Sequence, residues 1–460
     1  MELFIKISQF VFIISVLVIL HEFGHFIPAR LFKTKVEKFY LFFDAGISLL
    51  RFKVVNGVKK FSFFTKRKPE EWEEDQETTE WGIGWLPLGG YVKIAGMIDE
   101  SMDKEQMKQE PKPWEFRSKP AWQRLIIMCG GVIVNFLLAW VIYSCLFVSI
   151  GETYIPINSL ENGIYADENG EKLGLKTGDK IVSIDGKDVY KFRETSLDLL
   201  LGDKATVDRN GEKIKIQLTD KGKKAVLESQ GINFVIPRVD ATIGLVGENY
   251  KASEIGLQVD DKIVALNNEP IEFWDEFDSR IKKTGDQEVS LKVLRKNKEI
   301  EFNFKMPDSA ILGLNSSTKS LQKLAITKEY SVGESIPRGL SETVNVLVKQ
   351  VKQFKLIFNR TIQGYKQVKG PIGIVETMAP EWDWIYIWRF MAMFSVWLAF
   401  LNILPIPALD GGHVMFLLYE MIRGKAPSEK AMERGQIVGF IIVMTLMVLV
   451  FGNDIWNLFK

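Results

Sequence analysis

Two residue types are scarce in this chain of 460 residues: it has two cysteines and three histidines. Cys129 and Cys145 fall in one apolar stretch, where helical rise would place them about 24 Å apart. They therefore cannot pair within that helix, and the sequence has no disulfide framework from which to infer the compartment. The net charge of +1 gives no reason to expect nucleic acid or another polyanion as a partner.

The average composition, 47% hydrophobic and 25% charged, conceals a segregation of apolar runs toward both ends of the chain. Four of these runs predict membrane-spanning helices. They cover residues 3–25, 125–150, 382–404 and 437–451. A signal peptide is the alternative for the first run, but no small-residue cleavage site follows it. Pro28 is expected to end this helix, and the lysines and arginines that flank residues 30–120 predict a cytoplasmic loop.

The first apolar run ends in His21-Glu22-Phe23-Gly24-His25, the HExxH pattern of zinc hydrolases. Positions four apart lie on one face of a helix, so His21 and His25 can direct two imidazole nitrogens at one ion. Glu22 lies beside the first ligand, where it can take a proton from a water molecule. A pair of histidines on an apolar helix can also be purely structural. However, ionisable groups at the end of a span are costly, and two of the three histidines are here.

Between the first two spans, residues 39–55 and 81–94 are aromatic and β-prone, and they predict strands. Residues 66–80 form a charged loop tip. In the second span Gly130 and Gly131 allow close helix contact. Asn135 places an amide in a dry environment, where it needs a partner. Its role is either an interhelical hydrogen bond or a substrate contact.

Residues 151–308 contain an internal repeat. Residues 173–189 realign with residues 255–271 at a constant offset of 82, and each copy predicts turns, an alternating strand and a helix. We therefore expect two copies of a small β-rich module. Their pattern resembles PDZ domains, which bind extended peptides by strand addition, although a spacer role without a ligand is also open.

After the repeat, residues 330–380 are amphipathic and predict a helix on a membrane surface or a plain connecting helix. In the third span, the run from Asn402 to His413 contains two prolines and a glycine pair, which predicts a broken helix. Such backbone is tolerated at membrane depth only where protein or a water cavity buries it. Asp410 lies in this break and is our preferred third metal ligand. Asp44 ranks below it because its surroundings are polar, and His413 is a rival ligand or a stabiliser of the turn.

The sequence resembles the site-2 protease family of intramembrane metalloproteases, and within it the bacterial RseP type. The resemblance runs nearly end to end through several motifs. These are HEFGH, GWLPLGGYV, Gly131 to Asn135, the tandem PDZ-like repeat, GPIGI at 370–374 and NILPIPALDGGH. Val132 departs from the family, where many members have proline.

The resemblance implies that His21, His25 and Asp410 bind one Zn²⁺ per chain and that Glu22 is the general base. It implies that Asn402 binds the substrate backbone and makes Asn135 a second candidate for this contact. A substrate helix hides its carbonyls and must unwind, so we expect an exposed strand edge within residues 39–55 to hold it by β-addition.

The expected fold is a polytopic α-helical membrane protein with four transmembrane helices, a cytoplasmic membrane-associated β region and two extracytoplasmic PDZ-like domains. Its expected parts are transmembrane helix 1 (1–30), the cytoplasmic loop (31–120), transmembrane helix 2 (121–150), PDZ-like domains (151–225 and 226–308), an amphipathic segment (309–381), transmembrane helix 3 (382–413), a second cytoplasmic loop (414–435) and transmembrane helix 4 with the C-terminus (436–460).

The expected function is hydrolysis of peptide bonds inside transmembrane segments, such as those of anti-sigma factors, and of remnant signal peptides. The expected partners are membrane-spanning substrates, the lipid bilayer and peptide ligands of the PDZ-like domains. The expected location is the bacterial inner membrane, with the active site toward the cytoplasm and the PDZ-like domains in the periplasm. The alternatives are a non-catalytic adaptor that binds peptides, which predicts a degraded metal site, and a metal transporter, which predicts polar groups along several spans.

Overall fold

The computed structural model describes residues 1–460 except 67–71, 73–77, 88, 98–109, 230–233 and 459–460, so most of the expected loop tip at 66–80 lies outside the described residues. The chain forms two compact units. The first comprises Met1–Ile150, Tyr330–Val351 and Val368–Lys460, and the second comprises Gly151–Glu329 and Lys352–Gln367. This division separates the apolar helices from the tandem repeat.

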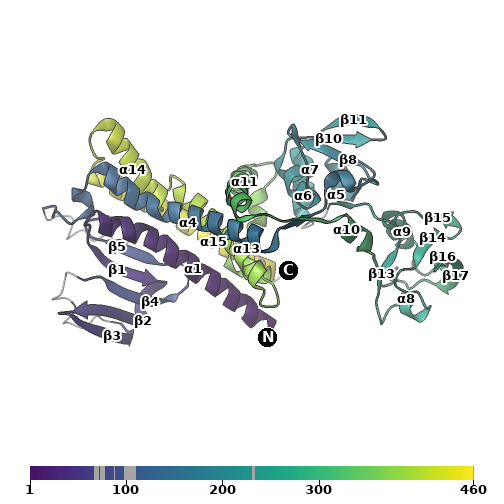
Figure 1. The fold of residues 1–460 in the computed structure, drawn as a ribbon, viewed down its shortest axis with the longest axis horizontal. Coiled ribbons are helices and arrows are strands. Elements are labelled where there is room, and N and C mark those ends of the chain that lie inside the picture. Colours follow the sequence, from purple (N-terminus) through teal and green to yellow (C-terminus); the bar gives the residue numbers. More distant parts are fainter. Residues whose placement is uncertain (67–71, 73–77, 88, 98–109, 230–233, 459–460) are drawn as a thin grey trace. The chain divides into compact units, whose positions relative to one another are not determined.

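Four helices of the first unit are long and apolar enough to cross a membrane, in agreement with the number expected from the sequence. They are α1 (Glu2–Leu31), α4 (Ala121–Ile150), α13 (Trp384–Ile403) and α15 (Glu429–Leu458) (Figure 1). Three of them share a core, in which Ile13 and Leu17 of α1 pack with Ile142 of α4 and Met391 of α13. This core fixes the helices on which the histidine motif and Asn135 lie.

Helix α1 does not end at Pro28, as the sequence predicts, but continues to Leu31. A proline inside a helix removes the hydrogen bond to the carbonyl four residues earlier, which here belongs to Gly24. That carbonyl lies against Gly130 of α4, where an added Cβ atom would come within 1.8 Å of it. The Gly24 oxygen, which cannot accept a hydrogen bond from Pro28, therefore faces another backbone at a tight helix contact, where Cα–H groups can approach it.

The third span breaks after Ile403, as expected, and the chain resumes as α14 (Asp410–Arg423). This helix occupies much of the segment 414–435 that the sequence predicts as a loop. The loop is shorter because α15 begins at Glu429, so the last helix also exceeds the expected span of 437–451. The apolar runs did not predict the end of α14 or the start of α15, because charged residues continue both helices beyond their apolar centres.

A five-stranded sheet follows α1, with the strand order β3-β2-β4-β1-β5. Its strands are β1 (Val36–Leu41), β2 (Phe43–Val55), β3 (Val58–Thr65), β4 (Glu80–Leu86) and β5 (Tyr91–Ile94). The strands predicted within 39–55 and 81–94 are confirmed. However, the outer strands of the sheet are β3 and β5, so an exposed edge within 39–55 is confined to residues 44–47 of β2, which pair with no described strand.

Aromatic side chains attach this sheet to the end of α1. Phe23 and Phe26 of α1 meet Phe39 of β1 and Trp81 of β4, with ring centroids 4.8 Å apart for Phe23 and Phe39 and 5.2 Å apart for Phe26 and Trp81. Phe23 lies inside the HExxH motif, so the helix face next to the histidines is the one that holds the sheet. Such ring pairs add about 0.5–1.5 kcal/mol each beyond their area burial.

The remaining helices of the first unit stabilise its ends. The segment before α4 contains η1 (Phe116–Ser118), and the segment before α13 contains α12 (Pro371–Glu376). Buried Asp454 of α15 accepts the backbone N–H groups of Gly370, Ile372 and Gly373, which explains the GPIGI motif as a satisfied helix N-terminus. The predicted amphipathic helix is α11 (Val332–Phe358), which belongs to the first unit as far as Val351 and on which Val344, Val351 and Phe358 are exposed.

The second unit contains the repeat predicted from the sequence. Its sheets have the orders β11-β10-β8-β9 and β15-β14-β16-β17, so equivalent strands hold equivalent places. The first sheet and its helices are β8 (Lys180–Ile184), β9 (Lys187–Asp188), β10 (Lys204–Arg209), β11 (Glu212–Gln217), α5 (Glu168–Lys172), α6 (Phe192–Leu201) and α7 (Asp220–Glu228). The second sheet and its helices are β14 (Lys262–Leu266), β15 (Glu269–Pro270), β16 (Glu288–Arg295), β17 (Lys298–Lys305), α8 (Lys251–Glu254) and α9 (Trp274–Ile281).

Shorter elements complete the second unit. They are β6 (Glu152–Tyr154), η2 (Ile157–Ser159), β7 (Ile164–Ala166), β12 (Val235–Pro237), β13 (Ile243–Val246), β18 (Leu314–Ser316), α10 (Lys319–Leu324), β19 (Ile326–Lys328) and η3 (Gly364–Gln367). Strand β7 pairs with β12, β13 pairs with β18, and β6 pairs with β19. The last pair brings the two ends of the repeat region together.

The two modules repeat their polar interactions as well as their strands. Buried Asp179 accepts hydrogen bonds from Nε and Nη2 of Arg209 at 2.6 and 2.8 Å, and buried Asp261 accepts them from Arg295 at 2.7 and 2.6 Å. Hydrogen bonding to Asp179 raises the pKa of Arg209. Each bidentate pair holds a turn against its sheet.

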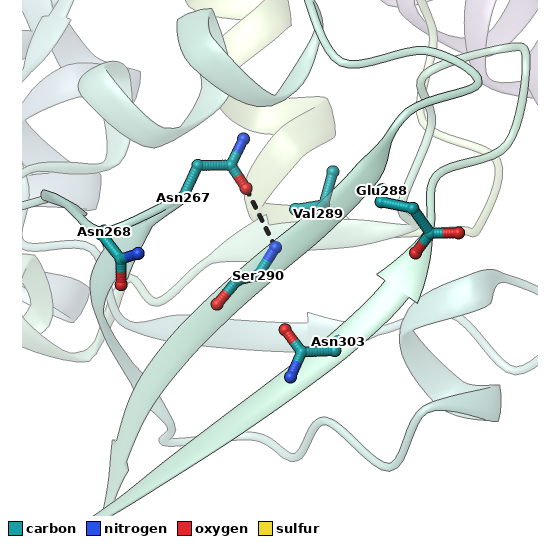
Figure 2. Close-up of a pocket in the computed structure, with 6 residues that line it drawn as sticks. All are labelled: Asn267, Asn268, Glu288, Val289, Ser290 and Asn303. Atoms are coloured by element: carbon teal, nitrogen blue, oxygen red, sulfur yellow. Dashed lines mark hydrogen bonds between the residues drawn. The ribbon is translucent and has the colours of Figure 1, made fainter.

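The hairpin turns correspond too. In the second module Asn267 accepts the N–H of Ser290 at the edge of a shallow polar pocket (Figure 2). In the first module Asp185 holds the same place and accepts the N–H groups of Asp203 and Lys204. Partial burial acts to raise the pKa of Asp185, but these N–H groups lower it. The pocket is therefore a by-product of a structural turn.

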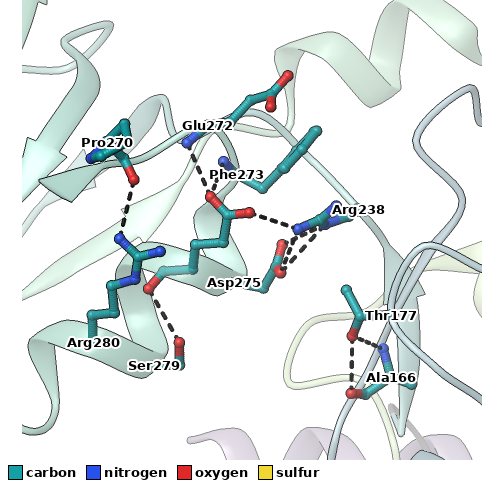
Figure 3. Close-up of polar contacts among 10 residues, drawn as sticks. Ala166, Thr177, Arg238, Pro270, Glu272, Phe273, Asp275, Ser279 and Arg280 are labelled. Atoms are coloured by element: carbon teal, nitrogen blue, oxygen red, sulfur yellow. Dashed lines mark hydrogen bonds and ion pairs between the residues drawn. The ribbon is translucent and has the colours of Figure 1, made fainter.

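The boundary between the modules lies later than the expected position at 225/226, because Val226, Phe234 and Val235 belong to the first core. Arg238 follows and connects the modules. Its backbone N–H reaches Gly163, while its guanidinium stacks 3.8 Å over the ring of Phe273 and pairs with Asp275 and Glu276 at the start of α9 (Figure 3). The second module likewise extends to β18, beyond the expected end at 308.

Candidate metal centre

His21, His25 and Asp410 come together in the first unit. The Nε2 atoms of the two histidines are 3.3 Å apart, and Oδ2 of Asp410 lies 3.3 Å from the first and 3.2 Å from the second. Three potential ligand atoms therefore form a nearly equilateral triangle. They come from one turn of α1 and from the first residue of α14.

This triangle fits a zinc ion. Tetrahedral ligands at zinc distances of 2.0–2.1 Å stand about 3.3–3.4 Å apart, close to the three separations seen here. Oδ2 of Asp410 is buried and makes no hydrogen bond with any described residue, although both Nε2 atoms are near it. The three side chains therefore converge on a common point, as expected of a donor set arranged for a cation.

Glycines let α4 approach the histidines closely. An added Cβ atom at Gly131 would lie 2.5 Å from Cε1 of His21 and 2.5 Å from Nε2 of His25. At Gly24 an added Cβ atom would lie 2.4 Å from the carbonyl oxygen of Gly130. No larger residue fits at these positions without separating the helices, so the site requires this close backbone contact.

Asp410 owes its place to the helix break. Gly411 and Gly412 pack directly on the preceding turn, where added Cβ atoms would lie 2.2 Å from the carbonyl oxygen of Leu404 and 2.2 Å from Cα of Pro407. Further along α14, Glu420 pairs with Arg124 of α4 at 2.5 Å. This pair fixes α14 along α4, so the first residue of α14 is held at the level of the histidines.

The two asparagines predicted as substrate contacts both reach His21, from different helices. Nδ2 of Asn402 lies 3.4 Å from Nε2, the ring atom that faces Asp410. Nδ2 of Asn135 lies 3.1 Å from Nδ1, on the opposite side of the ring. Asn135 is completely buried, whereas Asn402 is partly exposed. Only Asn402 is therefore on the side of the ring where a substrate could meet the metal.

The rival ligands are not members of the cluster. Asp44 lies in the sheet, where it accepts hydrogen bonds from Ser48 and Tyr91 at 3.0 Å each. Burial and the neighbouring Asp44 carboxylate raise the pKa of Tyr91, so its hydroxyl remains a donor. His413 is on α14 one turn after Asp410 and does not join the three described ligand groups.

Glu22 is buried on α1 beside the turn that leads into β5. An added Cβ atom at Gly90 would lie 3.6 Å from Cγ of Glu22 and 2.6 Å from the carbonyl oxygen of Tyr40. The GWLPLGGYV motif thus brings the backbone of the sheet next to the glutamate. Glycine is required because the strand and the helix meet there without room for a side chain.

Two contributors escaped sequence reasoning. The carbonyl of Ile127 on α4 lies 2.9 Å from Nδ1 of His25, and a backbone group leaves no signal in the sequence. Ser395 of α13 donates a 2.7 Å hydrogen bond to the carbonyl of Asn135. A completely buried hydroxyl in an apolar span was the signal that could have identified Ser395.

A family model described as peptidase family M50 matches residues 9–65 and 50–446. The chain belongs to peptidase family M50. Protease RseP of Yersinia pestis is 26% identical over 487 residues, which cover 99% of each chain. The regulator of sigma-E protease RseP of Escherichia coli is 26% identical over 474 residues, which cover 97% of this chain and 98% of the relative. A relative from Rickettsia conorii, named as a zinc metalloprotease, is 28% identical over 99% of this chain and 100% of its own.

This M50 peptidase is an intramembrane zinc metalloprotease of the kind that acts in regulated intramembrane proteolysis. Its four apolar helices fit a protein of the inner membrane. Zinc is therefore the cation whose coordination distances the triangle of donors matches. Its class of substrate is membrane-embedded proteins, and its surroundings are lipid.

The glycine contact yields the first testable prediction. Gly131→Ala should push the two imidazoles apart and weaken zinc binding by about tenfold or more, a loss typical of disturbed ligand orientation. Zinc per purified chain, measured by elemental analysis, tests this expectation. Gly452→Ala is the matched control, because that helical glycine has no atom within 4 Å of an added Cβ. Equal zinc content in the two variants would contradict the proposed tight contact.

Proposed function

We propose that His21, His25 and Asp410 hold the zinc ion and that Glu22 is the general base of peptide hydrolysis. The observation that carries this proposal is the triangle of two Nε2 atoms and one carboxylate oxygen, with sides of 3.2–3.3 Å. Three protein ligands leave one position open, which is the pattern of catalytic rather than structural zinc.

Bound zinc supplies Lewis-acid chemistry that makes water nucleophilic near neutral pH and polarises the scissile carbonyl. Glu22 takes the proton from the attacking water and returns it to the departing amine. Its burial between α1 and the Gly90 turn keeps bulk water away from the carboxylate. Asn402, on the side of His21 that faces Asp410, donates its amide N–H to the substrate backbone.

Strand addition to β5 positions the unwound substrate. Among the described residues β5 has a strand partner only on its β1 side, and its entry turn at Gly90 adjoins Glu22. A substrate strand paired there has its backbone hydrogen bonds satisfied next to the base. This edge takes the role that the sequence had suggested for residues 39–55.

The topology follows from charge. Basic residues at the end of α1 and around the start of α4 favour a cytoplasmic location for the sheet and the metal centre; they are Arg30, Lys33, Arg117, Lys119 and Arg124. The two repeated modules, which we assign to PDZ-like domains, are then periplasmic. By analogy with the relatives named as regulators of sigma-E, the substrates include membrane-anchored regulators of transcription.

The modules outside limit access of bulky substrates and bind peptide ends. Their repeated strand orders support two copies of one β-rich module, whose sequence pattern resembles PDZ domains. A non-catalytic adaptor, the alternative function, predicts a degraded metal site, whereas each expected ligand and the base are present here.

The base assignment predicts that Glu22→Gln retains zinc and the fold but loses cleavage. The amide cannot accept the proton, so the rate of cleavage of a membrane-anchored reporter should fall by about 10²- to 10⁴-fold. Zinc content and thermal unfolding of the same preparation are the controls. Cleavage at the wild-type rate would refute the role of Glu22.

The ligand assignment predicts that Asp410→Asn lowers zinc occupancy, because a neutral amide is a weaker ligand than a carboxylate. Asp44→Asn is the matched control, since Asp44 contributes to the sheet and not to the cluster. Elemental analysis of both purified variants decides between them. Loss of zinc from the Asp44 variant alone would show that Asp44, and not Asp410, is the third ligand.

The gating role predicts that removal of the modules broadens selectivity. Because Tyr154 and Ile326 already pair between β6 and β19, residues 155–325 can be replaced by a short turn. The shortened enzyme should cleave full-length reporters as well as reporters that lack their periplasmic domain. An unchanged preference for shortened reporters, with zinc retained, would count against gating.

A further inference from the structure

The two candidate histidine ligands, His21 and His25, present their second ring nitrogen to the same helix, α4, which contributes no ligand itself. Nδ1 of His25 lies 2.9 Å from the carbonyl oxygen of Ile127, and Nδ1 of His21 lies 3.1 Å from the amide of Asn135. The two α4 residues are a little more than two turns apart. One rigid helix thus faces the back of both imidazoles.

The chemistry of a ligating imidazole determines what must face Nδ1. A neutral ring that gives the lone pair of Nε2 to a metal carries its proton on Nδ1, so the facing atom must be an acceptor. The carbonyl of Ile127 meets this requirement for His25. At His21 the nearer amide atom is Nδ2, while Oδ1 of Asn135 is buried and has no hydrogen-bond partner among the described residues. A half-turn of the amide exchanges the two atoms.

We infer that Asn135 is a positioning residue, whose carboxamide oxygen accepts the Nδ1–H of His21 and so fixes Nε2 as the metal-binding atom. This inference rests on the ligand assignment proposed above. It replaces the substrate contact that the sequence had left open for Asn135, since the side chain is completely buried behind the ring.

Neighbouring groups hold Asn135 in place. Its carbonyl accepts the hydroxyl of Ser395 from α13, and Gly131 one turn earlier packs on both imidazoles. Complete burial keeps out water that could substitute for the amide. Removal of the acceptor therefore leaves the His21 ring free to turn or to change tautomer, and either change weakens the metal bond.

The test compares three variants of the full-length enzyme in detergent. Asn135→Leu has a similar volume and no acceptor, and Asn135→Asp keeps the acceptor. Ser144→Ala is a control, because among the described residues its buried hydroxyl donates to the carbonyl of Trp140 on its own helix and to no other group. Zinc affinity is measured by competition with a chelator and elemental analysis. We expect about 10- to 100-fold weaker binding for Asn135→Leu, with affinity close to wild type for the other two variants.

Each outcome decides the inference. Wild-type affinity in Asn135→Leu, or equal losses in the Leu and Asp variants, would overturn it. Retained zinc with a raised KM for a reporter would restore the substrate contact. If Asn135→Leu folds poorly, the Asp variant still tests the acceptor. Recovery of cleavage by Asn135→Leu when zinc is added distinguishes a weakened site from misfolding. Failure of Asp410→Asn to lower zinc would instead overturn the ligand assignment itself.

Discussion

The backbone contact between α1 and α4 at Gly24, Gly130 and Gly131 is the constraint on which the metal centre depends. Lipid tails are as apolar as leucine, so helices in a membrane associate through close packing and polar contacts rather than through a hydrophobic driving force. Here the close packing and the polar contacts coincide. The glycines bring α4 against the imidazoles, and the polar groups of α4 then reach the ring nitrogens.

The break between α13 and α14 is the second requirement, because it turns a spanning helix into a holder for a carboxylate. An unbroken helix would carry Asp410 along α13 and away from the histidines. The break leaves backbone groups without helical partners, which membrane proteins tolerate only inside protein. Gly439 of α15 covers this turn, since an added Cβ atom there would lie 2.5 Å from the backbone nitrogen of Ala408. The last helix therefore has a structural role at the site, although it provides no ligand.

Sequence reasoning predicted what periodicity and motif spacing encode: four spans, the strands of the first loop, the repeat at an offset of 82 and the group of residues that meet at the centre. It misjudged features that tertiary contact decides. Pro28 does not end α1, and the Gly24 carbonyl, which cannot bond to Pro28, faces Gly130 of α4 instead. Strands within 39–55 are internal, apart from residues 44–47, because β4 inserts between β2 and β1, an order that no local pattern reveals. The partner of His25 is a backbone carbonyl, and backbone groups are the same at each residue.

Charge balance explains how this site can lie in an apolar layer. Glu22 is buried, Oδ2 of Asp410 is buried beside the two imidazoles, and charges at such depth are costly. In the proposed zinc site a divalent cation would offset both carboxylates, and histidines that donate from Nε2 and are protonated on Nδ1 would add no charge. The sum over the four side chains and the ion is then zero. An extra positive charge on either imidazole would upset this balance and remove a ligand, so neutral acceptors behind the rings, a carbonyl at His25 and a carboxamide at His21, suit the site electrostatically as well as geometrically.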